Sequence, residues 1–175
     1  EPRVGQSYPN YYAAKLASRF CKVALSGTGG DELFAGYPWR YYRAVVNDDF
    51  ANYIEKYYSF WQRLLPGDTH RQILEPVADA VSNVSLRGIF RNVFHEHAER
   101  LTSPEDYVNH SLYFEAKTFL HGVLTVDDKL SMAHGLETRV PFLDNDLVDF
   151  AMRVPVRYKL GNLDAVIRQD ENEPG

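Results

Sequence analysis

Cysteine is almost missing from this sequence, because Cys21 is the only one among 175 residues. One cysteine excludes an internal disulfide framework and cannot form a zinc site by itself, and such scarcity is typical of a reducing compartment. We therefore expect a cytoplasmic location, with Cys21 as a small core residue.

Long apolar runs and basic blocks are missing as well. No apolar stretch approaches the roughly 20 residues that a membrane-spanning helix needs. The formal charge is −5 at a pI of about 5.7, and lysine and arginine form no block that would attract a nucleic acid. We expect no membrane and no nucleic acid among the partners, and the composition leaves the oligomeric state open.

The sequence does have enough apolar material for a substantial core, since 45% of its residues are hydrophobic and 14% are aromatic. Its length suggests one domain or part of one. The chain begins at Glu1 without a methionine and ends in the polar stretch QDENEPG, residues 169–175. We expect a piece of a longer protein, with a disordered tail over 169–175.

The spacing of apolar positions predicts an α/β fold that is predominantly α-helical, with few parallel strands. Residues 8–20 carry apolar side chains at helical spacing, and KVALS, residues 22–26, predicts a short buried strand bounded by glycine. Further helices are predicted at 48–65, 68–81, 85–101, 103–132 and 145–154.

Local signals predict where some of these helices begin and end. Asn47 is the expected cap of the helix at 48–65, which Pro66 and Gly67 should end. SPED, residues 103–106, combines a serine cap with a proline and two acids in the first turn of the next long helix.

The stretch SGTGGDE, residues 26–32, follows the predicted strand and opens a helix. Such a loop directs backbone N–H groups toward an anion, and its glycines, Gly27, Gly29 and Gly30, let a ligand approach closely. Asp31 suits a magnesium ion that bridges phosphates. The alternative is an ordinary turn with an aspartate cap, because the loop lacks the P-loop lysine and its glycines do not follow the spacing GxGxxG.

Two blocks of the sequence resemble one known family. SGTGGDELFAGY, residues 26–37, is similar to SGxGxDExxxGY, the second nucleotide-site motif of the glutamine-hydrolysing asparagine synthetases. DDKLSMAHGLETRVPFLDNDLVDFAM, residues 127–152, is similar to the later block of that family, DxxSMxxxLExRxPFLD. By this resemblance, residues 1–168 are identified as part of the family's C-terminal ATP-pyrophosphatase synthetase domain.

The resemblance implies an adenine-nucleotide α-hydrolase-like domain of a carbon–nitrogen ligase. In such enzymes ATP and Mg²⁺ adenylate the side-chain carboxylate of aspartate and release pyrophosphate, and ammonia from glutamine then displaces AMP to give asparagine. The motif match implies that Asp31 binds the metal and that the nucleotide is bound by Ser26, Gly27, Gly29 and Gly30.

Thr28 departs from the family pattern. Many members carry glutamate at this position, where it is credited with helping the ammonia step. Threonine forms hydrogen bonds but cannot act as a base near neutral pH. Thr28 thus stands at a position expected to be catalytic. The carboxylate that accepts ammonia is therefore either aspartate or, as in a related amidotransferase, a different carboxylate.

The later block supplies further candidates. Glu137 and Arg139 stand two apart, so in an extended segment they lie on one face, where they either frame a polar ligand on the substrate side or form a structural ion pair. Asp144 is expected to cap the helix that follows. Asp128 and Lys129 face either the cleft or solvent.

Two motifs of the family do not occur in this sequence. They are the first nucleotide loop, SGGxDS, and the N-terminal cysteine of the glutaminase domain, and Lys159 is a poor match to the family's downstream lysine. We therefore expect the isolated chain to be inactive and ammonia to come from a glutaminase domain absent here. The competing interpretation is a non-catalytic helical binding or scaffold module whose glycine loop is only a turn.

Overall fold

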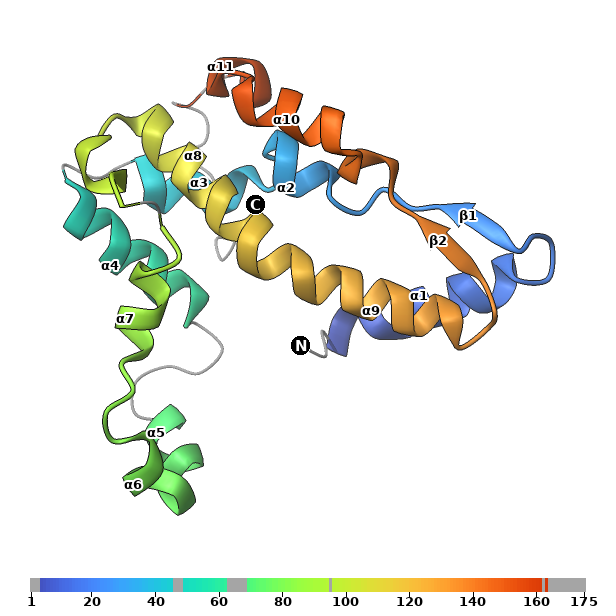
Figure 1. The fold of residues 1–175 in the computed structure, drawn as a ribbon, viewed down its shortest axis with the longest axis horizontal. Coiled ribbons are helices and arrows are strands. Elements are labelled where there is room, and N and C mark those ends of the chain that lie inside the picture. The colour runs from blue at the N-terminus through green and yellow to red at the C-terminus, as the bar shows by residue number, and fades with distance from the viewer. Residues whose placement is uncertain (1–3, 46–48, 63–68, 95, 162, 164–175) are drawn as a thin grey trace. The chain divides into compact units, whose positions relative to one another are not determined.

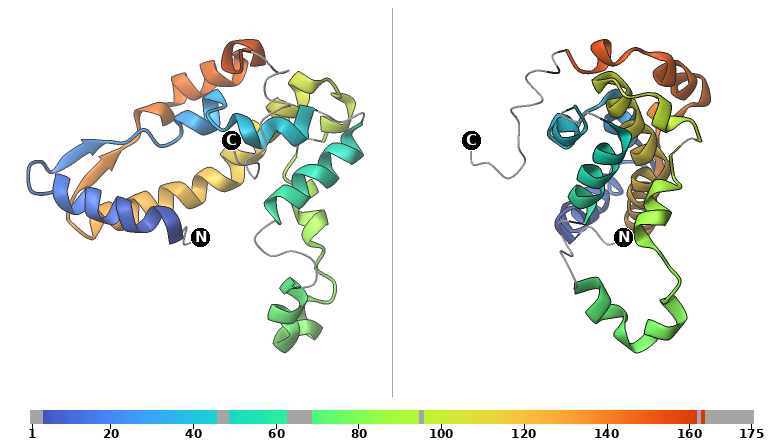
Figure 2. Two further views of the ribbon diagram at one scale, coloured as in Figure 1. Left: turned by 180° about the vertical axis from the view of Figure 1, so that it is seen from behind. Right: turned by 90° about the vertical axis from the view of Figure 1, so that its left-hand side faces the viewer.

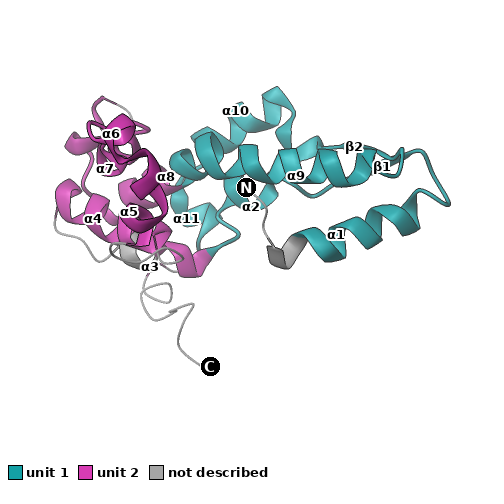
Figure 3. Cartoon of the chain, turned by 90° about the horizontal axis from the view of Figure 1, so that it is seen from below, with its two compact units in different colours: residues 1–37, 112–161 teal, residues 38–111, 162–175 magenta. Residues whose placement is uncertain are grey.

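The computed structural model describes residues 4–45, 49–62, 69–94, 96–161 and 163. The chain divides into two compact units, residues 1–37 with 112–161 and residues 38–111 with 162–175 (Figure 3). Helices dominate both units, and the described strands are two short parallel ones (Figure 1). The expected fold class, a predominantly helical α/β arrangement with few parallel strands, is confirmed.

The first unit is built around one long helix and the two strands. Its α1 packs along α9, and α9 also contacts β2 (Figure 2). Its elements are α1 (Val4–Ala17), β1 (Val23–Leu25), α2 (Gly30–Phe34), the π-helical turn η3 (Glu115–Phe119), α9 (Leu120–Met132), β2 (Glu137–Arg139), η4 (Pro141–Leu143), α10 (Asn145–Arg153) and α11 (Val156–Lys159).

The two strands pair in parallel, with Val23 opposite Glu137 and Leu25 opposite Arg139. The backbone N–H of Ser26 extends the pairing by donating to the carbonyl of Arg139 at 2.8 Å. The prediction of a buried strand at 22–26 is wrong, because Val23 and Leu25 are 43% and 76% exposed. Side chains alternate along a strand, and only the face that carries Ala24 is half-buried.

The second unit is helical and has an aromatic core. Tyr53 is fully buried, stacks on Tyr57 and Tyr107 with ring centroids 5.5 and 4.8 Å apart, and pairs its hydroxyl with that of Ser111 at 3.1 Å. Its elements are α3 (Pro38–Val45), α4 (Phe50–Trp61), α5 (Thr69–Leu74), η1 (Glu75–Val77), α6 (Ala78–Val81), α7 (Leu86–Arg91), η2 (Ala98–Arg100) and most of α8 (Pro104–Phe114). The last residues of α8, from Leu112, belong to the first unit.

Two helix predictions succeed because their caps act locally. At the start of α8, the Asp106 N–H donates to the Ser103 hydroxyl at 3.2 Å, and the Ser103 N–H donates to the Asp106 carboxylate at 3.0 Å. Asp144 caps α10 by accepting from the N–H groups of Asp146 and Leu147 at 3.0 and 3.3 Å. The predicted helix at 103–132 is present as α8, η3 and α9 in succession.

Other predicted boundaries are wrong. The helix at 68–81 is broken at η1, where Pro76 has no N–H to donate. The helix predicted at 85–101 ends at Arg91, and the buried Phe94 and Ala98 lie beyond it, in a turn and in η2. Helix α4 begins at Phe50 with Asp49 as its cap, at 2.8 Å from the Asn52 N–H.

Several other expectations can be compared with the described residues only in part. Asn47, Pro66, Gly67 and the tail at 169–175 lie outside them. Cys21 is exposed, so its assignment to the core is wrong; it lies two residues before β1, whose outer face is open. No helix in the described part of the chain is both long and apolar enough to cross a membrane.

Candidate functional site

The glycine loop joins β1 to α2 in the first unit, as the sequence predicts. Gly29 takes a positive φ of 95° at the N-cap of α2, a backbone conformation that residues with a Cβ atom rarely adopt. The Gly30 N–H donates to the Gly27 carbonyl at 3.1 Å and closes the turn. Among the described residues, the N–H groups of Gly27 and Gly29 have no acceptor.

The later sequence block packs directly on this loop. A Cβ atom placed on Gly29 would lie 2.8 Å from Cγ of Leu143, and one on Gly30 would lie 3.5 Å from the ring of Phe142. These two side chains belong to η4, which follows β2. The fold therefore brings together the two sequence blocks that carry the resemblance.

A small pocket of about 220 Å³ opens beside the loop, within the first unit. It is lined by one residue of α1, three of the loop and three of α9, namely Asn10, Ser26, Gly27, Thr28, Val123, Val126 and Asp127. Three residues proposed from the sequence, Ser26, Gly27 and Thr28, thus share one pocket. Gly29, Gly30 and Asp31 are not among its lining residues.

A chain of polar contacts runs along the wall of this pocket. The hydroxyl oxygens of Ser26 and Thr28 are 2.8 Å apart, and the Thr28 N–H donates to the Ser26 hydroxyl oxygen at 3.3 Å. The Thr28 hydroxyl also donates to Oδ2 of Asp127 at 3.5 Å. Two hydroxyls and one carboxylate are thereby linked.

The sequence pattern does not single out Asp127. The neighbouring Asp128 and Lys129 are exposed and lie outside the pocket lining, which favours the solvated of their two interpretations. A weak signal does exist, because Asp127 follows Val123 by four positions and so lies on the same helix face. Choosing that face requires knowledge of where the glycine loop lies.

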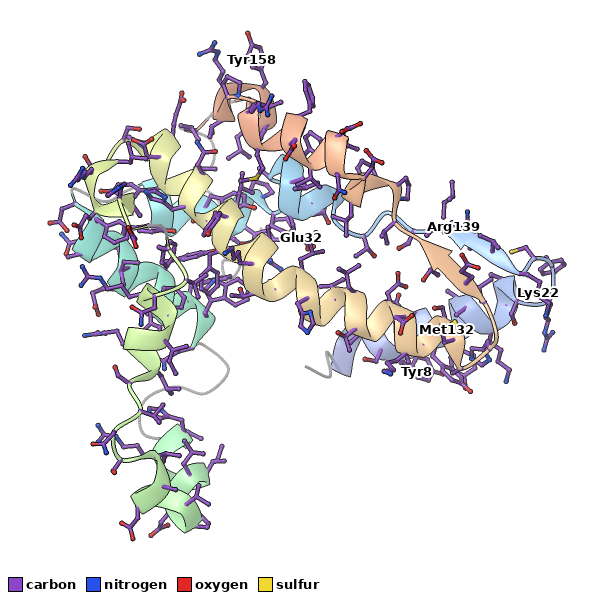
Figure 4. The ribbon with its side chains drawn as sticks, in the orientation of Figure 1. Tyr8, Lys22, Glu32, Met132, Arg139 and Tyr158 are labelled. Atoms are coloured by element: carbon purple, nitrogen blue, oxygen red, sulfur yellow. The ribbon has the colours of Figure 1, made fainter. Side chains whose placement is uncertain are left out.

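Asp31 and Glu32 point in different directions from α2. Glu32, labelled in Figure 4, is buried at 2% exposure and accepts a hydrogen bond from the Tyr37 hydroxyl at 3.1 Å. Asp31 is exposed and lies against Gly36, where a Cβ atom would be 2.6 Å from Cγ of Asp31. Of the two acids, Asp31 is the one available to a ligand from solvent, and its metal-binding role stays a prediction.

Glu137 and Arg139 pair on β2. Figure 4 shows Arg139 on β2. Nε of Arg139 donates to Oε1 of Glu137 at 2.9 Å, and the Arg139 and Glu137 side chains are 65% and 57% exposed. They line none of the loop pocket. Their geometry is that of an exposed ion pair, and a role in binding substrate stays a prediction.

Two electrostatic features of the described residues concern possible metal ligands and a shifted pKa. These residues contain no group of three or more histidine, cysteine, aspartate or glutamate side chains that could hold a metal ion. Desolvation by burial lowers the pKa of Lys159 in α11 from its ordinary value of 10.5. A metal at this site would therefore need ligand atoms from a bound molecule as well as from the protein.

Comparison with known proteins points to one family. The family model described as asparagine synthase matches residues 1–169. The chain is 29% identical to the glutamine-hydrolyzing asparagine synthetase 1 of Bacillus subtilis over 88% of its length, and 28% identical to asparagine synthetase 3 of the same organism over 79%. It spans 28% and 21% of the length of these two relatives. No solved structure matches the chain.

Proposed function

The chain belongs to the asparagine synthase family, and on that premise we propose that the full-length protein is an ATP-dependent ligase that makes asparagine. It would adenylate the side-chain carboxylate of aspartate and transfer ammonia from glutamine, with release of AMP and pyrophosphate. The observation that supports this proposal is the packing of Leu143 on Gly29, which brings the two motif blocks into contact.

The geometry of the loop fits a bound triphosphate. The N–H groups of Gly27 and Gly29, without acceptors among the described residues, can donate to phosphate oxygens. Open space surrounds the Cα of Gly27, where an added Cβ atom would meet no heavy atom within 4 Å. A ligand can therefore approach this part of the backbone closely.

Asp31 fits a magnesium ion in one specific way. Mg²⁺ is commonly held by one or two carboxylates together with phosphate oxygens, so one exposed acid at the loop is a sufficient protein ligand. Bound ATP would supply the leaving group that makes a carboxylate reactive toward ammonia. The chain's own residues would orient the phosphates and stabilise the negative charge that develops on them.

Pyrophosphate release by the full-length protein tests this function. We expect release that requires ATP, Mg²⁺, ammonium and aspartate, and a panel of other carboxylates in place of aspartate identifies the acceptor. Asp31→Asn should lower the rate by at least about tenfold and raise the Mg²⁺ requirement. Asp149→Asn, an exposed aspartate on α10, is the charge-matched control. Absence of pyrophosphate release with every carboxylate would favour the scaffold interpretation.

A further inference from the structure

A hollow of about 540 Å³ lies within the second unit. Side chains of α4, α5, α6 and α7 line it, and α5 and α6 contact each other (Figure 1). Its volume falls within the roughly 300–1,000 Å³ that is usual for pockets that bind small organic ligands. The glycine loop and its pocket belong to the first unit, and none of their residues lines this hollow. The proposed ligase function therefore leaves the hollow unexplained.

One wall of the hollow is aliphatic. Its side chains come from α5, α6, the turn that follows and α7, and they are Leu74, Ala78, Val81, Val84 and Leu86. None of the described residues 69–81 is buried, and Val84 and Leu86 are 51% and 40% exposed. Apolar side chains that surround a hollow and stay open to water favour an apolar occupant, because the occupant removes their surface from water.

The charged side chains that line the hollow are Arg71 on α5 and Arg87 on α7. None of the described lining residues is acidic, although the chain as a whole has a formal charge of −5. Nη2 of Arg87 pairs with Glu55 of α4, and the guanidinium carbon of Arg87 lies 5.9 Å from the centre of the Tyr58 ring. A guanidinium has five N–H donors, so Arg87 keeps donors for a second anion.

Two hydroxyl groups of the lining can donate as well. The Tyr58 hydroxyl accepts from Nε2 of Gln62, and the Ser85 hydroxyl accepts from the Gly88 N–H at 3.0 Å. Neither hydroxyl proton has an acceptor in the part of the chain that the structure describes. Guanidinium and hydroxyl donors thus share one hollow with an aliphatic wall.

We propose that this hollow binds an organic acid, whose anionic head group, a carboxylate or a phosphate, is attached to an aliphatic body. Arg71 and Arg87 pair with the head group, and Tyr58 and Ser85 donate to it. The aliphatic body covers the wall around Val84. A cation would be repelled by the arginines, and a neutral alcohol would forgo the charge-assisted hydrogen bonds. The proposal does not depend on the proposed ligase function.

Methyl NMR of the full-length protein tests the binding. Leucine and valine methyl groups are labelled, and the protein is titrated with octanoate, octyl phosphate, octanol, octylammonium and acetate. We expect saturable shifts at Leu74, Val81 and Val84 with an eight-carbon anion, and the tighter of the two anions identifies the head group. Octanol and octylammonium lack the negative charge and acetate lacks the aliphatic body, so each should bind at least about tenfold more weakly.

Ala78→Phe tests the place of binding and keeps both arginines. Ala78 lines the hollow and is exposed, so a phenyl ring there should take the space of the aliphatic body and weaken octanoate binding at least about tenfold. Ala80→Phe is the matched control on the same helix, because Ala80 is exposed and does not line the hollow. It should change octanoate binding less than about twofold.

Arg71→Gln tests the charge. It should weaken octanoate binding at least about tenfold, because a charge-assisted hydrogen bond is lost, and leave octanol binding unchanged. Arg91→Gln is the charge-matched control, since Arg91 is exposed on α7 and lies outside the lining. Equal binding of octanol and octanoate would overturn the proposal. Equal effects of Ala78→Phe and Ala80→Phe, or the absence of any saturable shift, would overturn it too.

Discussion

The Thr28 hydroxyl lies 3.5 Å from Oδ2 of Asp127, although 99 positions separate the two residues in the sequence. Two features of the first unit produce this contact. The parallel pairing of β1 with β2 fixes where the glycine loop begins, and a short turn joins α9 to β2. The carboxylate of Asp127 on α9 therefore lies close to the hydroxyl of Thr28, the third residue of the glycine loop.

Gly29→Ala should destabilise the protein by about 2 kcal/mol or more, because the backbone has a positive φ and the new methyl group would overlap Leu143. Urea unfolding followed by circular dichroism measures the change. Gly27→Ala is the matched control, since an added Cβ atom there meets nothing within 4 Å. Equal effects of the two substitutions would contradict the close packing of η4 on the loop.

Ser103→Ala should cost about 1 kcal/mol of stability, because the first turn of α8 loses the oxygen that accepts from the Asp106 N–H. The same unfolding experiment measures it. Ser59→Ala is the control, because its exposed hydroxyl only donates to the Lys56 carbonyl within α4. Equal changes in the free energy of unfolding for Ser103→Ala and Ser59→Ala would show that the capping box does not stabilise α8.

Removal of the Glu137 and Arg139 pair should change stability very little. Both side chains are mostly exposed, so a double-mutant cycle with Glu137→Gln and Arg139→Gln should give a coupling of about 0.2–1 kcal/mol that decreases in about 1 M salt. A fall in turnover far beyond this coupling would instead support contact with substrate. A coupling that salt leaves unchanged would contradict the exposed geometry.

Lys159 should make stability depend on alkaline pH. Burial lowers its pKa in the folded state below the ordinary 10.5, so between the two values the unfolded chain holds more protons, and stability rises with pH there. Below the folded-state pKa the penalty is fully present and constant. The measurement is unfolding of the protein and of Lys159→Met at several pH values, and a difference between them that does not vary toward pH 10.5 would refute this assignment.

The sequence predicts the local features of this fold well. The caps of α8 and α10 act within three residues, and the glycine at a positive φ lies within one turn, so each is visible as a short pattern. It predicts helix continuity less well. The break at η1 comes from Pro76, which has no N–H to donate, and α7 ends at Arg91 although apolar residues continue at helical spacing beyond it.

The candidate site divides in the same way. The strand, the glycine loop and the short helix that follows it are written in consecutive residues, as are the motif blocks that identify the family, and the sequence by itself determined them. Only the tertiary structure decided that Asp127 faces Thr28, that Leu143 lies on Gly29 and that Val23 and Leu25 are exposed. The reason is physical: backbone geometry and capping are settled within a few residues, whereas the environment of a side chain depends on segments brought to it from far along the chain.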